Sequence, residues 1–128
     1  MYVRLTVDQI VEIHDTELAE SNGLAGIKEP GYLEFIAEKP FSVFFGNEQY
    51  PGLFLKAAVL MSGLIKSHCF NDANKRTGVV STYIFLKLNG HQLDAAEDDL
   101  LEMAIRVAKN EISEERLASW LEQNSYRE

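Results

Sequence analysis

The stretch that decides the fold reads S-H-C-F-N-D-A-N-K-R and occupies residues 67–76. It gathers an imidazole, a carboxylate, an amide and two cations, namely His68, Asp72, Asn74, Lys75 and Arg76. A stable core does not need so many polar groups together. Apolar residues recur at helical spacing on both sides of it, over residues 53–65 and 77–88. We therefore expect a polar loop that joins two central antiparallel helices.

These residue types suit a phosphate ester and its metal ion. The first N–H groups of a helix are unpaired, so a helix beginning here would bind an anion, and Asn74, Lys75 and Arg76 would add donors and positive charge. Asp72 would hold Mg²⁺ bridging phosphate oxygens, although the same carboxylate would also serve as a helix N-cap. Histidine has the side chain whose unperturbed pKa lies nearest neutrality, which makes His68 the candidate general base.

The pattern H-x-F-x-D-A-N-K-R resembles the signature of the Fic/Doc superfamily, and of its Doc (death-on-curing) toxin branch in particular. The matching positions are His68, Phe70, Asp72, Asn74, Lys75 and Arg76. Flanking strings also resemble this branch: I-H-D at residues 13–15, P-G-L at 51–53, K-A-A at 56–58 and N-G at 89–90. The resemblance covers nearly the whole chain and implies a single Fic/Doc domain over residues 1–128.

Another branch of the superfamily transfers AMP and reads H-x-F-x-x-G-N-G-R-x-x-R. Ala73 and Lys75 stand where that motif has glycines, and Val79 stands where it has its second arginine. Glycine lets a backbone approach a phosphate closely, whereas lysine fills that space with a charged stem. The Doc branch carries lysine here, and the resemblance implies a protein kinase that binds ATP in the reverse sense and phosphorylates a hydroxyl, expected to be a threonine of elongation factor Tu.

Two other functions stay open: an AMP transferase, and a catalytically silent module that binds an antitoxin. The resemblance also implies an antitoxin of the prevent-host-death type, whose flexible tail would fold along an apolar groove. Some members of the superfamily block themselves with a helix reading S/T-x-x-x-E-G/N. The nearest string here begins at Thr16 and ends in Ser21 instead of Gly or Asn, so we expect the restraint to come from another chain.

Composition limits the alternatives. A chain of 128 residues forms about one domain, and 20 acidic against 12 basic residues give a net charge of −8, which argues against a general nucleic-acid surface. The single cysteine, Cys69, excludes an intrachain disulfide. The sequence shows neither a signal-peptide pattern at its start nor an apolar run of about 20 residues, so we expect a soluble, cytoplasmic protein.

Helix signals divide the chain into an all-α domain of about six helices. Starts are predicted at a capping box over residues 6–9, at Pro30, at Pro51, after the motif, at Asp94 and at Ser113. The apolar face of the helix after the motif is expected to be Val79, Val80, Tyr83, Ile84 and Leu88. The polar tail after Glu122 is expected to fray.

Residues 41–50, F-S-V-F-F-G-N-E-Q-Y, interrupt the helical pattern. They predict either a β-hairpin with its turn at Gly46 and Asn47 or an aromatic-rich loop tucked over the core. In the superfamily this segment is a flap that aligns the target by strand-like pairing. His14 is interpreted as a core histidine, with a role in shaping the site left open, and residues 97–99, E-D-D, as a solvated helix start.

Overall fold

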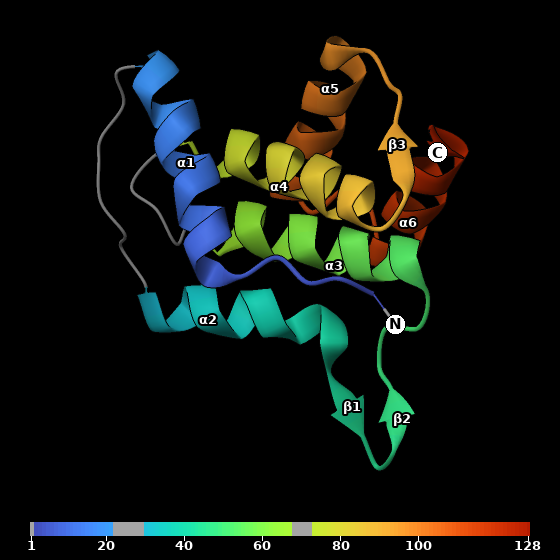
Figure 1. Ribbon diagram of the computed structural model, residues 1–128. Coiled ribbons are helices and arrows are strands. Elements are labelled where there is room, and N and C mark those ends of the chain that lie inside the picture. Colours follow the sequence, from blue (N-terminus) through green and yellow to red (C-terminus); the bar gives the residue numbers. More distant parts are fainter. Residues whose placement is uncertain (1, 22–29, 68–72) are drawn as a thin grey trace.

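The computed structural model describes residues 2–21, 30–67 and 73–128, which form six α-helices, a short 3-10 helix and two antiparallel strand pairs (Figure 1). In chain order the elements are α1 (Val7–Ser21), α2 (Pro30–Glu38), η1 (Lys39–Phe41), β1 (Val43–Phe44), β2 (Asn47–Glu48), α3 (Leu53–Lys66), α4 (Asn74–Leu88), β3 (His91–Leu93), α5 (Glu97–Ala108), α6 (Glu114–Gln123) and β4 (Ser125–Arg127). The predicted all-α class with a small hairpin is confirmed. None of the described helices is both long and apolar enough to cross a bilayer.

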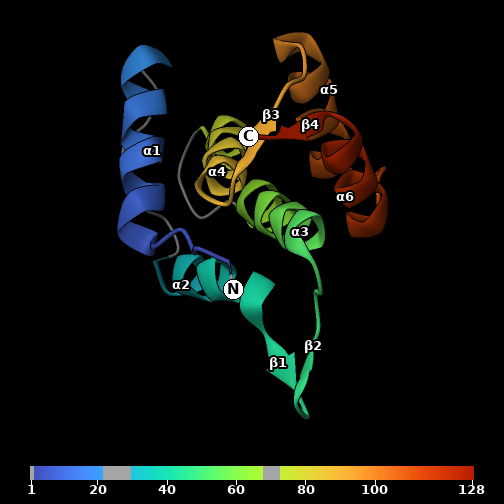
Figure 2. The ribbon, with the colours of Figure 1, turned by 45° about the vertical axis from the view of Figure 1, so that its right-hand side comes forward.

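Helices α3 and α4 form the central antiparallel pair. In Figure 2 they are seen nearly end-on, with α1 and α2 on one side and α5 and α6 on the other. A Cβ added at Gly78 of α4 would lie 2.7 Å from Cγ1 of Ile65, and one added at Gly63 of α3 would lie 2.8 Å from Cγ2 of Ile36. These two glycines therefore let α4 and α2 approach α3 more closely than a larger residue would permit.

Local capping explains two of the helix starts. At α1 the predicted capping box is formed in both directions: the Thr6 N–H donates to Oε1 of Gln9 at 2.9 Å, and the Gln9 N–H donates to Oγ1 of Thr6 at 3.2 Å. At α6 the Ser113 hydroxyl oxygen accepts from the Arg116 N–H at 3.1 Å. Both predictions of an N-cap are confirmed.

The start of α5 and the structure of the C-terminal tail both differ from expectation, because the tail pairs with β3 and with the residue that follows it. Strand β4 pairs with β3 in the register His91↔Arg127, so the tail is held instead of frayed. The Asp94 N–H donates to the Asn124 carbonyl at 2.7 Å, which extends this pairing past β3. Asp94 therefore does not cap α5, whose N-cap residue is Ala96, without a side-chain bond.

The most deeply buried face of α4 is not its predicted apolar face. Its fully buried positions carry mostly small or hydroxyl side chains: Thr77, Gly78, Ser81, Thr82, Phe85 and Leu86. The predicted apolar face is only partly covered, and Leu88 is 44% exposed. Because α3 lies so close to α4, small side chains occupy the interface and the larger apolar ones turn away from it.

Strands β1 and β2 form a hairpin, which excludes the alternative of a loop tucked over the core. The turn lies at Phe45 and Gly46, one residue earlier than predicted, and both have positive φ, at +50° and +79°. Positive φ at both central residues is typical of the tight turn whose twist suits a hairpin. Val43, Phe44 and Phe45 are 62%, 59% and 89% exposed.

Candidate active site

The described part of the motif is the start of α4. Ala73 occupies the N-cap position in the left-handed conformation, with φ +64° and ψ +24°, and its carbonyl accepts from the Thr77 N–H at 2.9 Å. An alanine has no side-chain acceptor, so Ala73 itself does not cap the helix with a side-chain hydrogen bond. Ala73 thus keeps the backbone conformation that glycine favours at the position where the AMP-transferring motif has one.

The first turn of α4 carries cations where a helix ordinarily has acids. Lys75 is exposed and Arg76 half-buried, and this turn holds no acidic residue. The first turn of α5 instead carries three acidic side chains, and that of α6 carries two. A cation here is repelled by the positive end of the helix dipole, at a cost of about 0.3–1 kcal/mol. Stability therefore does not explain this placement, and a helix N-terminus that carries two cations has the charge that suits an anion.

Three of the five predicted site residues, Asn74, Lys75 and Arg76, lie together on this turn, with Asn74 half-buried. His68, the predicted base, and Asp72, the predicted metal ligand, fall outside the described residues, as do Cys69 and Phe70. Helix α3 ends at Lys66 and α4 begins at Asn74, so the motif joins the two central helices as expected. Within the described ranges no cluster of three metal-ligating side chains occurs.

A cavity of about 500 Å³ adjoins the cations of α4. Lys75 and Arg76 line one end of it, and Glu17 of α1 and Glu97 of α5 contribute carboxylates. The remaining lining is mainly apolar: Val79, Val80, Tyr83, Leu100 and Leu101. Its charge is therefore mixed, because two carboxylates line it together with the cations that are predicted to bind phosphate.

An apolar groove of about 320 Å³ between α1 and α4 shares Glu17 and Val80 with this cavity. Its apolar lining comes from both helices: Leu5 and Ile13 on the α1 side, and Val80, Ile84 and Leu88 on α4. The two hollows together run along the partly exposed apolar face of α4 and end at Lys75 and Arg76. The sequence predicts an apolar groove but does not locate it, because apolar periodicity alone does not specify which segment lies against a helix face.

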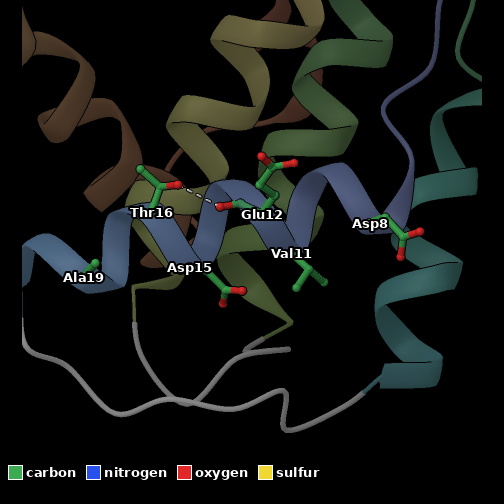
Figure 3. Close-up of a pocket in the computed structure, with 6 residues that line it drawn as sticks. All are labelled: Asp8, Val11, Glu12, Asp15, Thr16 and Ala19. Atoms are coloured by element: carbon green, nitrogen blue, oxygen red, sulfur yellow. Dashed lines mark hydrogen bonds between the residues drawn. The ribbon is translucent and has the colours of Figure 1, made fainter.

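The outer side of α1 holds another hollow, which does not suit a phosphate. Figure 3 shows that all six of its labelled lining residues belong to α1. Asp8, Glu12 and Asp15 would repel an anion, and among the residues that the structure describes no cation lines the hollow. The Thr16 hydroxyl donates to the Glu12 carbonyl at 3.0 Å, the dashed line in Figure 3.

Three polar side chains on α1 and α4 are buried: His14, Thr77 and Ser81. His14 is 1% exposed, and its Nδ1 lies 3.3 Å from Oδ1 of Asp15, as expected for a core histidine with a polar neighbour. The hydroxyls of Thr77 and Ser81 are buried and form no hydrogen bond with any residue that the structure describes. The small polar side chains spaced four residues apart on α4 were the available signal for this interface.

Comparison with known proteins identifies the family. The model of the Fic/DOC family matches residues 4–86, which include the described start of α4. The chain is 31% identical over 118 residues to "Protein kinase doc" of Escherichia phage P1, covering 91% of each protein. It is 36% identical over 86 residues to "Toxin Doc" of Mycolicibacterium smegmatis (strain ATCC 700084 / mc(2)155), covering 62% of this chain and 66% of that one. The all-α fold, the cationic first turn of α4 and these matches lead to one conclusion: the chain belongs to the Fic/DOC family, in its Doc branch.

Proposed function

We propose that this protein is a Doc-type toxin that acts as a protein kinase, transferring the γ-phosphoryl group of ATP to a threonine hydroxyl of elongation factor Tu. The observation that carries the proposal is the similarity to "Protein kinase doc" over 91% of both chains. The cations in the first turn of α4 support it. The helix dipole repels these cations, and the negative charge of a bound polyphosphate would offset that repulsion.

The proposed step exchanges one P–O bond for another. The hydroxyl oxygen of the target attacks the γ-phosphorus, the bond from that phosphorus to ADP breaks, and His68 accepts the hydroxyl proton. Asn74, Lys75, Arg76 and the N-terminus of α4 bind the phosphate oxygens, and charge neutralisation at these oxygens lowers the barrier. No covalent enzyme intermediate is needed.

The donor set fits Mg²⁺. This ion takes one or two carboxylates and completes its shell with water and phosphate oxygens, so a cluster of three protein ligands is not required. We assign Asp72 as the carboxylate. When bound, Mg²⁺ neutralises negative charge on the phosphate oxygens. The single cysteine and the supply of ATP both suit a reaction in the cytoplasm.

We also propose that an antitoxin of the prevent-host-death type covers the α1–α4 groove. One relative bears the name "Toxin Doc", and in this chain the apolar face of α4 is left partly exposed along that groove. A flexible tail that folds as it binds would cover Ile84 and Leu88. Its end would then lie beside Lys75 and Arg76, where it would interfere with ATP.

Intact-mass spectrometry of elongation factor Tu after incubation with the protein, ATP and Mg²⁺ tests the reaction. We expect a mass increase of one phosphate with the wild-type protein and none with His68→Ala. The loss of a general base commonly costs about 10²–10⁴-fold in rate. An increase of one AMP would instead establish the nucleotide-transferring alternative, and no adduct on any bacterial protein would favour the silent binding module.

A further inference from the structure

The two walls of the α1–α4 groove differ in chemistry. The α4 wall is apolar, because Val80, Ile84 and Leu88 lie four residues apart and form one row on that helix. The α1 wall carries the carboxylates of Glu12 and Glu17, and in the described part of the chain no lysine or arginine lines the groove. A segment that fills the groove therefore meets apolar side chains on one side and negative charge on the other.

The two carboxylates are placed so that one bound helix would reach both. Glu12 is exposed and Glu17 is half-buried. Figure 3 shows the carboxylate of Glu12 on the opposite side of the α1 ribbon from that of Asp15. The five-residue step from Glu12 to Glu17 corresponds to a rise of about 7.5 Å along α1. Two cations four or five residues apart on a helix lying along the groove would match this spacing.

Helix α1 also concentrates the negative charge of the protein. Its 15 residues include five acids and no lysine or arginine, so it holds a formal charge of −5 out of −8 for the whole chain. Like charges four residues apart, such as Asp8 and Glu12, repel one another and destabilise a helix. The stability of α1 therefore does not explain this concentration of acids.

This charge discriminates among the occupants that an apolar groove could accept. Covering a carboxylate removes it from water, which is costly unless a cation or a hydrogen-bond donor takes the place of the water. A second copy of this chain, at −8, would bring mainly negative charge to α1, and so would an anionic lipid surface. A helix with apolar residues on one side and lysine or arginine beside them suits both walls.

We infer that the antitoxin segment in the α1–α4 groove is a cationic amphipathic helix, with its apolar side chains on α4 and lysine or arginine beside Glu12 and Glu17. The inference rests on the proposed binding of an antitoxin to this groove and adds the chemistry of the bound segment. The two carboxylates then determine which antitoxin is accepted, because a neutral or acidic segment would cover them without supplying a cation. The charge of α1 also speeds the encounter with a cationic segment.

The test reverses one charge on the α1 wall. Glu12→Lys is suitable because Glu12 lines the groove but not the cavity beside Lys75 and Arg76. Glu122→Lys is the matched control: it makes the same change at an exposed position on α6, which Figure 2 shows on the other side of the central helices from α1.

Calorimetric titration measures the Kd of a purified prevent-host-death antitoxin for the full-length variants. At about 50 mM NaCl we expect Glu12→Lys to raise the Kd about fivefold to tenfold and the control to change it less than about twofold. At about 500 mM NaCl the difference should shrink, because salt screens exposed charges. Glu12→Gln should act in the same direction with a smaller effect, and it covers the case in which Glu12→Lys does not fold.

A charge swap identifies the contact on the antitoxin. Each lysine and arginine of the bound segment is replaced in turn by glutamate, and we expect at least one such antitoxin to bind Glu12→Lys more tightly than it binds the wild type.

Separate outcomes test the inference and the proposal beneath it. If Leu88→Glu loses the antitoxin while Glu12→Lys keeps the wild-type Kd, the antitoxin occupies the groove and the inference is wrong. An equal effect of Glu122→Lys, or a bound segment without lysine or arginine, would also overturn the inference. Self-association of the purified protein that Leu88→Glu abolishes would identify a second copy as the occupant. If the wild type binds no antitoxin, the antitoxin proposal itself fails, and the inference fails with it.

Discussion

At the scale of single residues, the start of α4 combines two features that oppose stability. Ala73 adopts a left-handed backbone, which costs an L-residue about 1–2 kcal/mol relative to the right-handed form. Lys75 and Arg76 follow in the first turn, against the helix dipole. A strained backbone and repelled cations in the same turn indicate that this turn serves a function other than stability.

The strain at Ala73 predicts opposite effects of two substitutions. Ala73→Gly relieves this strain of about 1–2 kcal/mol, but the greater entropy of the unfolded chain costs about 0.4–1 kcal/mol. We therefore expect a free energy of unfolding equal to that of the wild type or up to about 1.6 kcal/mol higher. Ala73→Val adds a branched side chain at a position that is 7% exposed, and should destabilise by more than about 1 kcal/mol. Urea denaturation measures both. A large loss of stability in Ala73→Gly would contradict the strained conformation.

Lys75 is expected to matter for ATP and not for folding. Lys75→Ala should raise the KM for ATP while the free energy of unfolding changes by less than about 0.5 kcal/mol, because the lysine is exposed and repelled by the dipole. Lys87→Ala makes the same change at the other end of α4 and should leave ATP kinetics unaltered. If both substitutions raised the KM for ATP equally, the effect would come from the overall charge of the protein and not from a contact between Lys75 and a phosphate.

At the scale of elements, α4 has two faces with different tasks. The face toward α3 is lined by small side chains, and Gly78 sets the distance between the helices. The other face keeps its apolar residues partly exposed along the groove shared with α1. An apolar face that a small domain leaves open is typical of an interaction site. One face of α4 is therefore part of the core of the fold, and the other is part of the proposed binding site of the antitoxin.

Leu88 provides a test of the groove. It is 44% exposed, so Leu88→Glu should cost little stability, yet it would place a charge in the apolar contact with the antitoxin. We expect a co-expressed prevent-host-death antitoxin to restore growth in cells carrying the wild-type toxin and to fail with Leu88→Glu. Tyr126→Glu, at a position on β4 that is 54% exposed and lies outside the groove, is the control and should still be neutralised. Neutralisation of both variants would place the antitoxin elsewhere.

At the scale of the whole molecule, the proposed function predicts toxicity. Expression of the protein without an antitoxin in a susceptible bacterium should arrest growth through the modification of elongation factor Tu, and His68→Ala at the same protein level should not. Growth curves with the two proteins quantified by immunoblot measure this. If both proteins were harmless, the toxin proposal would be wrong, and if both arrested growth, toxicity would not depend on His68.

The local structure at the candidate site was predictable where it depends on residues that are close together in the sequence. Asn74, Lys75 and Arg76 lie on one helical turn because they are neighbours in sequence, and the described structure confirms that turn. The left-handed backbone at Ala73 and the carboxylates of Glu17 and Glu97 beside the cations were not predictable. They depend on how α1 and α5 pack against α4, which no local pattern of α4 contains.

The sequence by itself determined the class of the fold, the extent of most helices and the caps of α1 and α6, because these depend on interactions between residues at most four positions apart. Only the tertiary structure decided which face of α4 is buried, why the tail pairs as β4, and that Lys56 is buried under the hairpin. Each of these depends on segments that are distant in sequence. Their burial and hydrogen bonding are settled by close packing, and the amphipathic pattern of a single helix does not specify its neighbours.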